Sequence, residues 1–126
     1  MSGVLDVLLD CGGVAVSSGT ISGLAFTSIF DRSASAGVTN SQTISGIGGP
    51  GSLGLVITGP AVIKYVRNGV GPTAVTGNIP VASGDRLYFL VDNTDTVSGA
   101  GTVTLSDAAA MVTVDTFTWK LGGYGL

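Results

Sequence analysis

Histidine and glutamate are absent from this chain of 126 residues, and cysteine occurs once. Without histidine, no Ser-His or Cys-His pair is available to activate a nucleophile, which removes the commonest forms of covalent catalysis. The single Cys11 excludes an internal disulfide. Because no cationic residue lies near it in sequence, we interpret Cys11 as a small buried hydrophobe. We therefore predict a protein that is not an enzyme and that binds no cofactor.

Charge is also scarce. Charged residues make up 10% of the chain, whereas typical soluble domains contain roughly 25%. Only five residues are basic and the net charge is −3, so no basic stripe is available to neutralise phosphates, and we expect no nucleic-acid partner. Soluble monomers normally cover themselves with charge. A surface this poor in charge predicts burial against other subunits in an assembly, with this chain as a homo-oligomer.

The N-terminal residues do not resemble an export signal. Residues 1–10 have no basic beginning, and Asp6 and Asp10 interrupt their apolar run. Neither a signal peptide nor a membrane span is predicted. We expect a protein made in the cytoplasm, with no membrane partner.

The residues that are abundant favour strands. Val, Thr and Ile dominate where Glu, Lys, Arg and Gln would cover the exposed faces of helices, and β-branched side chains fit a pleated sheet. Short apolar runs alternate with Gly, Asp, Asn and Ser breaks at intervals of about ten residues, which is typical of a sandwich. The runs cover residues 4–9, 21–30, 41–45, 53–57, 62–67, 86–91, 101–105 and 115–121. The sequence predicts one all-β domain with no crossover helices.

Alternation within three of these runs identifies the core. In residues 86–91 one set of alternate side chains is apolar, and in residues 115–121 the same is true. In residues 21–30 we expect three side chains to face inward, with Gly23 at a bulge or close contact. The predicted core positions are Leu24, Phe26, Ile29, Leu87, Phe89, Val91, Phe117, Trp119 and Leu121.

Turn chemistry marks the connections. Asn68 and Gly69 both tolerate positive φ, which makes this pair a strong hairpin signal. Residues 83–85 (Ser-Gly-Asp) are typical of a tight turn. Residues 31–40 are small and polar, and we predict a loop there.

Two motifs resemble ligand-binding sites, but their sequence context argues against that function. Residues 46–51 satisfy G-x-G-x-x-G, but Pro50 lies inside the motif and the next run is strand-like, so we interpret it as a loop rather than a dinucleotide site. Asp92, Asn93 and Asp95 carry oxygen ligands suited to calcium, but their spacing departs from an EF-hand. We interpret Asp92, like Asp85, as a turn residue, and predict no metal.

Aromatic residues offer a further alternative. Tyr65, Tyr88 and Trp119 are the components of a sugar-stacking platform, and the two tyrosines lie near each other if their strands pair. Trp119 shares its face with core positions, so we assign it to the core. The tyrosines are equally suited to anchor a protein interface, where tyrosine is enriched.

The order of these elements resembles an immunoglobulin-like β-sandwich module found in bacterial surface proteins and bacteriophage virion proteins. The resemblance covers about residues 21–121 and rests on turn and core positions. It departs from the module in the Gly/Pro insertion at residues 46–54 and in the sparse charge. The matching segments are Ser41-Gln-Thr-Ile-Ser-Gly-Ile47, Leu55-Val-Ile-Thr-Gly59, Lys64-Tyr-Val-Arg-Asn-Gly69 and Ile79-Pro-Val-Ala-Ser-Gly-Asp-Arg-Leu87.

This resemblance implies a Greek-key antiparallel sandwich that serves display or assembly and has no catalytic residues. Residues 1–20 would then form an N-terminal arm or extra strand, and residues 122–126 a C-terminal tail. We expect a structural protein of a tailed-phage virion, preferably a capsid decoration or cement protein bound to the major capsid or tail protein. The alternative is a carbohydrate-binding or adhesion module of a tail tip or fibre, with a host glycan as partner. The candidate interface residues are Val4, Leu5, Val7, Leu8, Tyr65, Tyr88, Tyr124 and Leu126.

Overall fold

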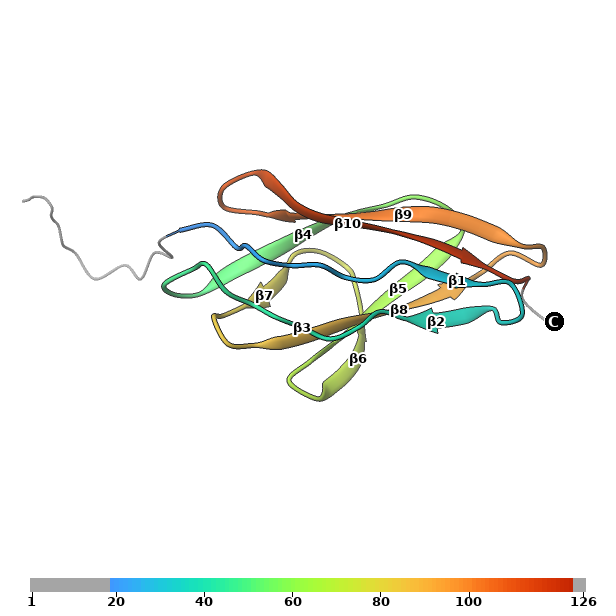
Figure 1. Cartoon of the computed structure of the whole chain (residues 1–126), viewed down its shortest axis with the longest axis horizontal. Coiled ribbons are helices and arrows are strands. Elements are labelled where there is room, and N and C mark those ends of the chain that lie inside the picture. Colours follow the sequence, from blue (N-terminus) through green and yellow to red (C-terminus); the bar gives the residue numbers. More distant parts are fainter. Residues whose placement is uncertain (1–18, 124–126) are drawn as a thin grey trace, which may run out of the picture.

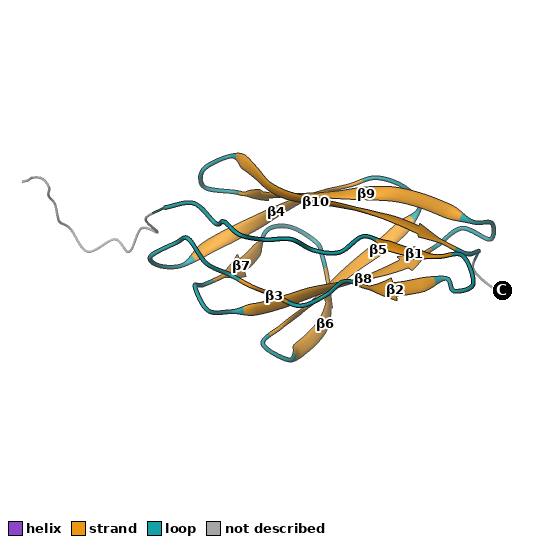
Figure 2. Ribbon diagram, in the orientation of Figure 1, coloured by secondary structure: helices purple, strands orange, loops and turns teal. Residues whose placement is uncertain are grey.

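The computed structural model describes residues 19–123, which form two β-sheets facing each other and contain no helix (Figures 1 and 2). No helix long and apolar enough to cross a membrane therefore occurs in this part of the chain. The strands are β1 (Ile29–Asp31), β2 (Ala36–Val38), β3 (Gln42–Thr43), β4 (Gly51–Ile57), β5 (Ala61–Arg67), β6 (Val70–Ala74), β7 (Ile79–Val81), β8 (Arg86–Asn93), β9 (Gly99–Asp107) and β10 (Val112–Leu121).

The strands are divided between two sheets. The β10 sheet has the order β1-β10-β9-β4-β7, and the β8 sheet has the order β2-β8-β5-β6, with β3 also paired to β8. The predicted all-β class is confirmed. The expectation of purely antiparallel pairing is wrong at one place, because Ile29–Asp31 of β1 runs parallel to the end of β10. The pairing is parallel because β1 and the end of β10 lie next to each other and run in the same chain direction.

The core lies between the sheets and follows the predicted alternation. Phe89 of β8 and Phe117 of β10 have ring centroids 5.9 Å apart. Phe26 meets the Phe89 ring edge-on at 5.0 Å, a favourable aromatic geometry. All nine predicted core positions are buried: Leu24, Phe26, Ile29, Leu87, Phe89, Val91, Phe117, Trp119 and Leu121.

Trp119 is completely buried, which confirms its assignment to the core. Its indole ring packs against the backbone of neighbouring β9. A Cβ atom on Gly101 would lie 2.8 Å from the indole Nε1 and would also collide with the carbonyl of Thr58. The indole Nε1 has no hydrogen-bond partner within residues 19–123. Glycine at position 101 is therefore required by space.

The N-terminal part of the domain is less regular than predicted. Of residues 21–30, only those from Ile29 onward belong to a strand, together with an isolated bridge between Ser22 and Ser45. Carboxylates hold the rest in place. The N–H of Ile21 donates to Asp107 at 2.9 Å, and the N–H of Phe26 donates to Asp115 at 2.8 Å. Side chains thus replace the backbone ladder that the apolar pattern had suggested.

The prediction of a loop throughout residues 31–40 is wrong in its second half. Residues Ala36–Val38 form β2 and pair with β8. The small residues of this segment carry no alternation that would reveal a strand, and the free edge of β8 provides the pairing. Gly37 lies directly against Ile29, where a Cβ atom would not fit.

The predicted turns are confirmed. Asn68 has φ 53° and Gly69 has φ 77°, and together they connect β5 to β6 in a tight hairpin. Gly84 has φ 92°, and the N–H of Asp85 donates to the carbonyl of Ala82 at 3.1 Å, which closes the turn before β8.

Candidate functional site

Two of the eight predicted interface residues lie in the described part of the chain. Tyr65 is in β5 and Tyr88 is in β8, and these strands pair as the tyrosine argument required. The other six lie outside residues 19–123, as does Cys11, so their predictions stay predictions. They are Val4, Leu5, Val7, Leu8, Tyr124 and Leu126.

The two tyrosines point to opposite faces of the β8 sheet. Tyr65 is paired with the core residue Phe89, and its ring packs against the edge of the core. Tyr88 is paired with Val66 and lies on the outer face. With Trp119 fully buried, the three aromatic residues do not form one stacking platform. The pattern located the strands correctly but did not give the register that separates the two rings.

The outer face of the β8 sheet carries a group of apolar side chains that we call the apolar face. Its members come from three adjacent strands in register. Val38 of β2 pairs with Leu90 of β8, which pairs with Lys64 of β5, and Asp92 pairs with Val62 in the next row. Val38 is 58% exposed and Val62 is 42% exposed, while the rest are partly covered. The apolar face consists of Val38, Val62, Lys64, Tyr88, Leu90 and Asp92.

One ion pair lies within the apolar face. The ammonium of Lys64 is 3.6 Å from a carboxylate oxygen of Asp92, and the side chains are 38% and 43% exposed. The interpretation of Asp92 as a turn residue is therefore wrong, because β8 continues to Asn93 and holds Asp92 in the strand. These six residues together have no net charge, and the exposed Arg86 adds a cation on the same side at the start of β8.

The outer face of the β10 sheet is different, and we call it the hydroxyl face. Threonines occupy alternate positions of β9 and β10, and several bond to one another. The hydroxyls of Thr58 and Thr102 are 2.9 Å apart, and the Thr118 hydroxyl donates to Ser28 at 3.2 Å. Val56 is 65% exposed beside Thr104, and Phe30 lies at the edge under Lys120. The hydroxyl face consists of Ser28, Val56, Thr58, Thr102, Thr104, Ser106, Thr116 and Thr118.

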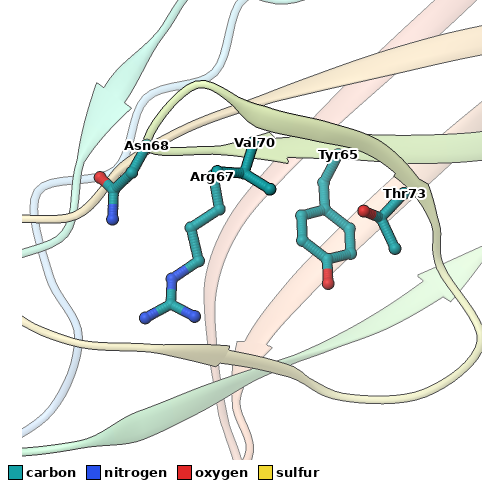
Figure 3. A pocket seen from close by; sticks show the side chains of 5 residues that line it. All are labelled: Tyr65, Arg67, Asn68, Val70 and Thr73. Atoms are coloured by element: carbon teal, nitrogen blue, oxygen red, sulfur yellow. The ribbon is translucent and has the colours of Figure 1, made fainter.

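A hollow of about 270 Å³ lies on the inner side of the β5–β6 hairpin, and we call it the hairpin pocket. Figure 3 shows the side chains of Tyr65 and Arg67 extending to the same side of the hairpin, with Thr73 next to the tyrosine ring. The register explains this arrangement, because Tyr65 pairs with Thr73 and Arg67 pairs with Val70. Asn68 completes the lining. An aromatic ring beside a guanidinium suits a small polar ligand with an apolar side.

Asp85 holds one wall of the hairpin pocket in place. Its carboxylate accepts from Arg67 Nε at 2.7 Å, from the Asn68 amide at 3.0 Å and from the Ala82 N–H at 2.8 Å. Burial alone would raise the pKa of Asp85. The bonds from Asn68, Ala82 and Arg67 together outweigh burial, and the pKa lies below its ordinary value. The prediction that Asp85 is a turn residue is confirmed, and the carboxylate also ties the hairpin to the turn before β8.

The residues considered for calcium do not converge. Asn93 is buried on the inner side, where its amide donates to the carbonyls of Val97 and Gly122 and its oxygen accepts from the Asp95 N–H. Asp92 lies on the opposite face with Lys64. Residues 19–123 contain no group of three or more His, Cys, Asp or Glu residues arranged to hold a metal ion. The glycine-rich motif at residues 46–51 leads directly into strand β4, as its interpretation as a loop predicted.

Comparisons with models of protein families, with curated proteins and with solved structures found no match to this chain. The two faces and the hairpin pocket are therefore interpreted from their own geometry.

Proposed function

We propose that this protein is a non-enzymatic structural protein of a tailed-phage virion, an immunoglobulin-like module that decorates the capsid surface as an oligomer. The apolar face is the observation that carries this proposal. Val38 on β2 and Val62 on β5 are 58% and 42% exposed on either side of β8, which contributes Leu90 and Tyr88 to the same face. Apolar side chains gathered in this way on a soluble domain indicate contact with another protein surface.

The strand order supports the immunoglobulin-like part of the proposal. In immunoglobulin domains, strands B, E and D lie in one sheet, and strands G, F and C lie in the other. Here β2 and β3, β8 and β5 take the places of B, E and D, while β10, β9 and β4 take those of G, F and C. The short β1 beside β10 corresponds to an edge strand. The strands β6 and β7 are additions between D and E.

The decoration role requires two kinds of contact. One joins copies of the chain, and the apolar face suits it. The other joins the oligomer to the major capsid or tail protein, and the apolar residues among 1–18 are candidates because an extended arm can pair with a neighbour's sheet edge. The sparse charge of the whole chain agrees with a surface that is shared between subunits.

Particles purified from the source of this gene test the virion role directly. Mass spectrometry of density-purified particles should detect the chain at a stoichiometric level. The purified protein should also co-sediment with particles from which it has been removed, and a variant lacking residues 1–18 should not. Particles in which the chain is absent would contradict the proposal.

The hairpin pocket favours a second candidate function, a carbohydrate-binding module of a tail tip or fibre. Tyr65 offers a ring face for stacking, and Arg67 and Thr73 offer donors for sugar hydroxyls. Glycan-array binding by the wild type, abolished in Arg67→Met and kept in the apolar-face variant Val38→Lys, would support this function. A glycan array without detectable binding would contradict this second function.

A further inference from the structure

The apolar face has the properties of a surface that contacts a second copy of itself. We propose that two copies associate face to face through the β8 sheets, around a two-fold axis that places Lys64 of each copy opposite Asp92 of the other. This inference rests on the oligomer in the proposed function and names its contact.

Charge complementarity carries the argument. A two-fold contact uses the same patch on both copies, so any charge on it must find its opposite on the same patch. The apolar face contains one cation and one anion, Lys64 and Asp92, and both remain more than a third exposed. A partner of strongly acidic or basic character would call for a face with net charge. The part of the face around Lys64 and Asp92 is neutral and self-complementary, while the exposed Arg86 lies on the same side at the far end of β8.

The strand register places Lys64 and Asp92 so that each can pair with the opposite charge of a facing copy. Val38, Leu90 and Lys64 form one row across β2, β8 and β5, and Asp92 and Val62 belong to the next row. The Lys64–Asp92 pair runs diagonally between the rows. A two-fold axis near Leu90 superposes each charge on its opposite in the facing copy. The valines at the two flanks then pack against apolar neighbours.

The edges of the β8 sheet favour packing through the face over pairing at the edge. On one side, the edge strand β6 contains Pro72, which has no N–H to give to an added strand. On the other side, residues before β1 cover β3. The Ala25 N–H donates to Gln42 at 3.2 Å, and Asn40 exchanges hydrogen bonds with Thr27. The β6 edge and the β3 part of the opposite edge are therefore poor templates for another chain.

The size of the face indicates a reversible dimer. The whole outer face of the β8 sheet, which includes the apolar face, measures roughly 20 by 27 Å, from four strands about 4.8 Å apart and a longest strand of eight residues at about 3.4 Å each. Two such faces bury on the order of 1,000 Å² in total, the lower end for specific contacts. We expect association that depends on protein concentration in the micromolar range or above.

Sedimentation velocity over a concentration series tests the contact with a matched pair of variants. Val38→Lys places a second cation on the apolar face and should weaken dimerisation by about ten-fold or more, because the one carboxylate in reach, Asp92, is already paired with Lys64. Val56→Lys makes the same change at a valine of similar exposure on the hydroxyl face. It should leave the dimer unchanged.

Charge reversal gives a test that does not depend on the stability of either variant. Lys64→Asp leaves two acids on each face and Asp92→Lys leaves two bases, so each variant alone should be monomeric. An equimolar mixture should form a heterodimer with an affinity within about three-fold of the wild type. A misfolded variant would not be restored by mixing.

A wild type that stays monomeric at all concentrations overturns the inference, as does a dimer that Val56→Lys disrupts and Val38→Lys does not. Neither result touches the virion role, since a monomer that co-sediments with particles would leave that proposal standing. A dimer that never binds particles would contradict the virion role and leave the two-fold contact standing.

Discussion

The outer faces of the two sheets cover the same core but differ in what they present to the surroundings. On the β10 sheet the alternate outward positions are mostly Thr and Ser, and on the β8 sheet they are mostly Val, Leu, Tyr and Ala around one ion pair, with Arg86 at one end. Threonine and valine have nearly the same shape and the same preference for strands. Strand formation therefore does not explain the difference. We propose that one face is adapted to contact with water and the other to contact with protein.

Hydrogen bonding makes the hydroxyl face self-sufficient. The face has two separate bonded pairs, Thr58 with Thr102 and Thr118 with Ser28, and water can satisfy what remains. The methyl groups of the apolar face gain nothing from water and are stabilised only by being covered. The comparison predicts that inner positions govern stability, whereas the outer face of the β8 sheet governs association.

The largest effect separates inner from outer positions. Phe89→Ala removes a fully buried ring that contacts Phe26 and Phe117, and we expect a loss of about 3–5 kcal/mol in the free energy of unfolding. The adjacent Leu90→Ala, on the outer face, should cost less than about 1.5 kcal/mol. Urea unfolding at dilute concentration measures both. Equal losses at the two positions would mean that Leu90 is covered within one copy.

We expect stability in acid to depend on two carboxylates whose pKa is lowered, Asp107 at the end of β9 and Asp85 in the turn before β8. The N–H of Ile21 above all, with those of Ala109 and Ala110, lowers the pKa of Asp107, against the raising effect of burial. A lowered pKa in the folded state contributes stability above the ordinary value of about 3.9. That stability is lost as the pH falls through the folded value.

We expect Asp107→Asn to cost about 2 kcal/mol at neutral pH, because the hydrogen bonds to a charged acceptor are weakened. The decline of stability below pH 4 should also become shallower than in the wild type. Thermal unfolding between about pH 2 and pH 7 measures both. Asp85→Asn is the counterpart at the turn before β8, where the pKa is also lowered, and should act in the same direction. If stability declined below pH 4 as steeply in both variants as in the wild type, these two carboxylates would not be its cause.

The sequence predicted the inner positions well and the contacts between strands poorly. Alternation alone identified Phe89, Val91 and Phe117, because a period of two is a local property. The strand at Ala36–Val38 was missed, since its residues are small and its pairing with β8 is imposed from outside the segment. Long-range pairing decides such cases, and a single sequence contains no direct record of it.

The apolar face shows the same limit. The alternation in residues 86–91 already placed Arg86, Tyr88 and Leu90 on one side. It could not place Val38 and Lys64 beside Leu90, because that row depends on the register of three strands. For the same reason Tyr65 and Tyr88 looked like neighbours on one surface, although a difference of one residue in register puts them on opposite faces.

A smaller effect tests the bonds of the hydroxyl face. Thr58→Val removes a hydroxyl that accepts from the Thr102 N–H at 2.9 Å and bonds to its hydroxyl, and we expect a loss of about 1 kcal/mol. Thr104→Val is the matched control, since its hydroxyl has no protein partner within residues 19–123, and should cost less than about 0.5 kcal/mol. Urea unfolding distinguishes them. If neither substitution lowered the free energy of unfolding, hydrogen bonds to water would stabilise the hydroxyl face as well as the bonds between its side chains do.

The smallest effect on stability concerns the ion pair that we expect to matter most for association. Lys64 and Asp92 are exposed and 3.6 Å apart, so their coupling within one copy should be below about 0.5 kcal/mol and should shrink further in salt. A double-mutant cycle with Lys64→Ala and Asp92→Ala, followed by urea unfolding of the monomer, measures it. Coupling above about 1 kcal/mol would mean that the pair stabilises the sheet itself. A small value leaves the charges free to be used between copies, where the same two residues decide whether identical faces attract or repel.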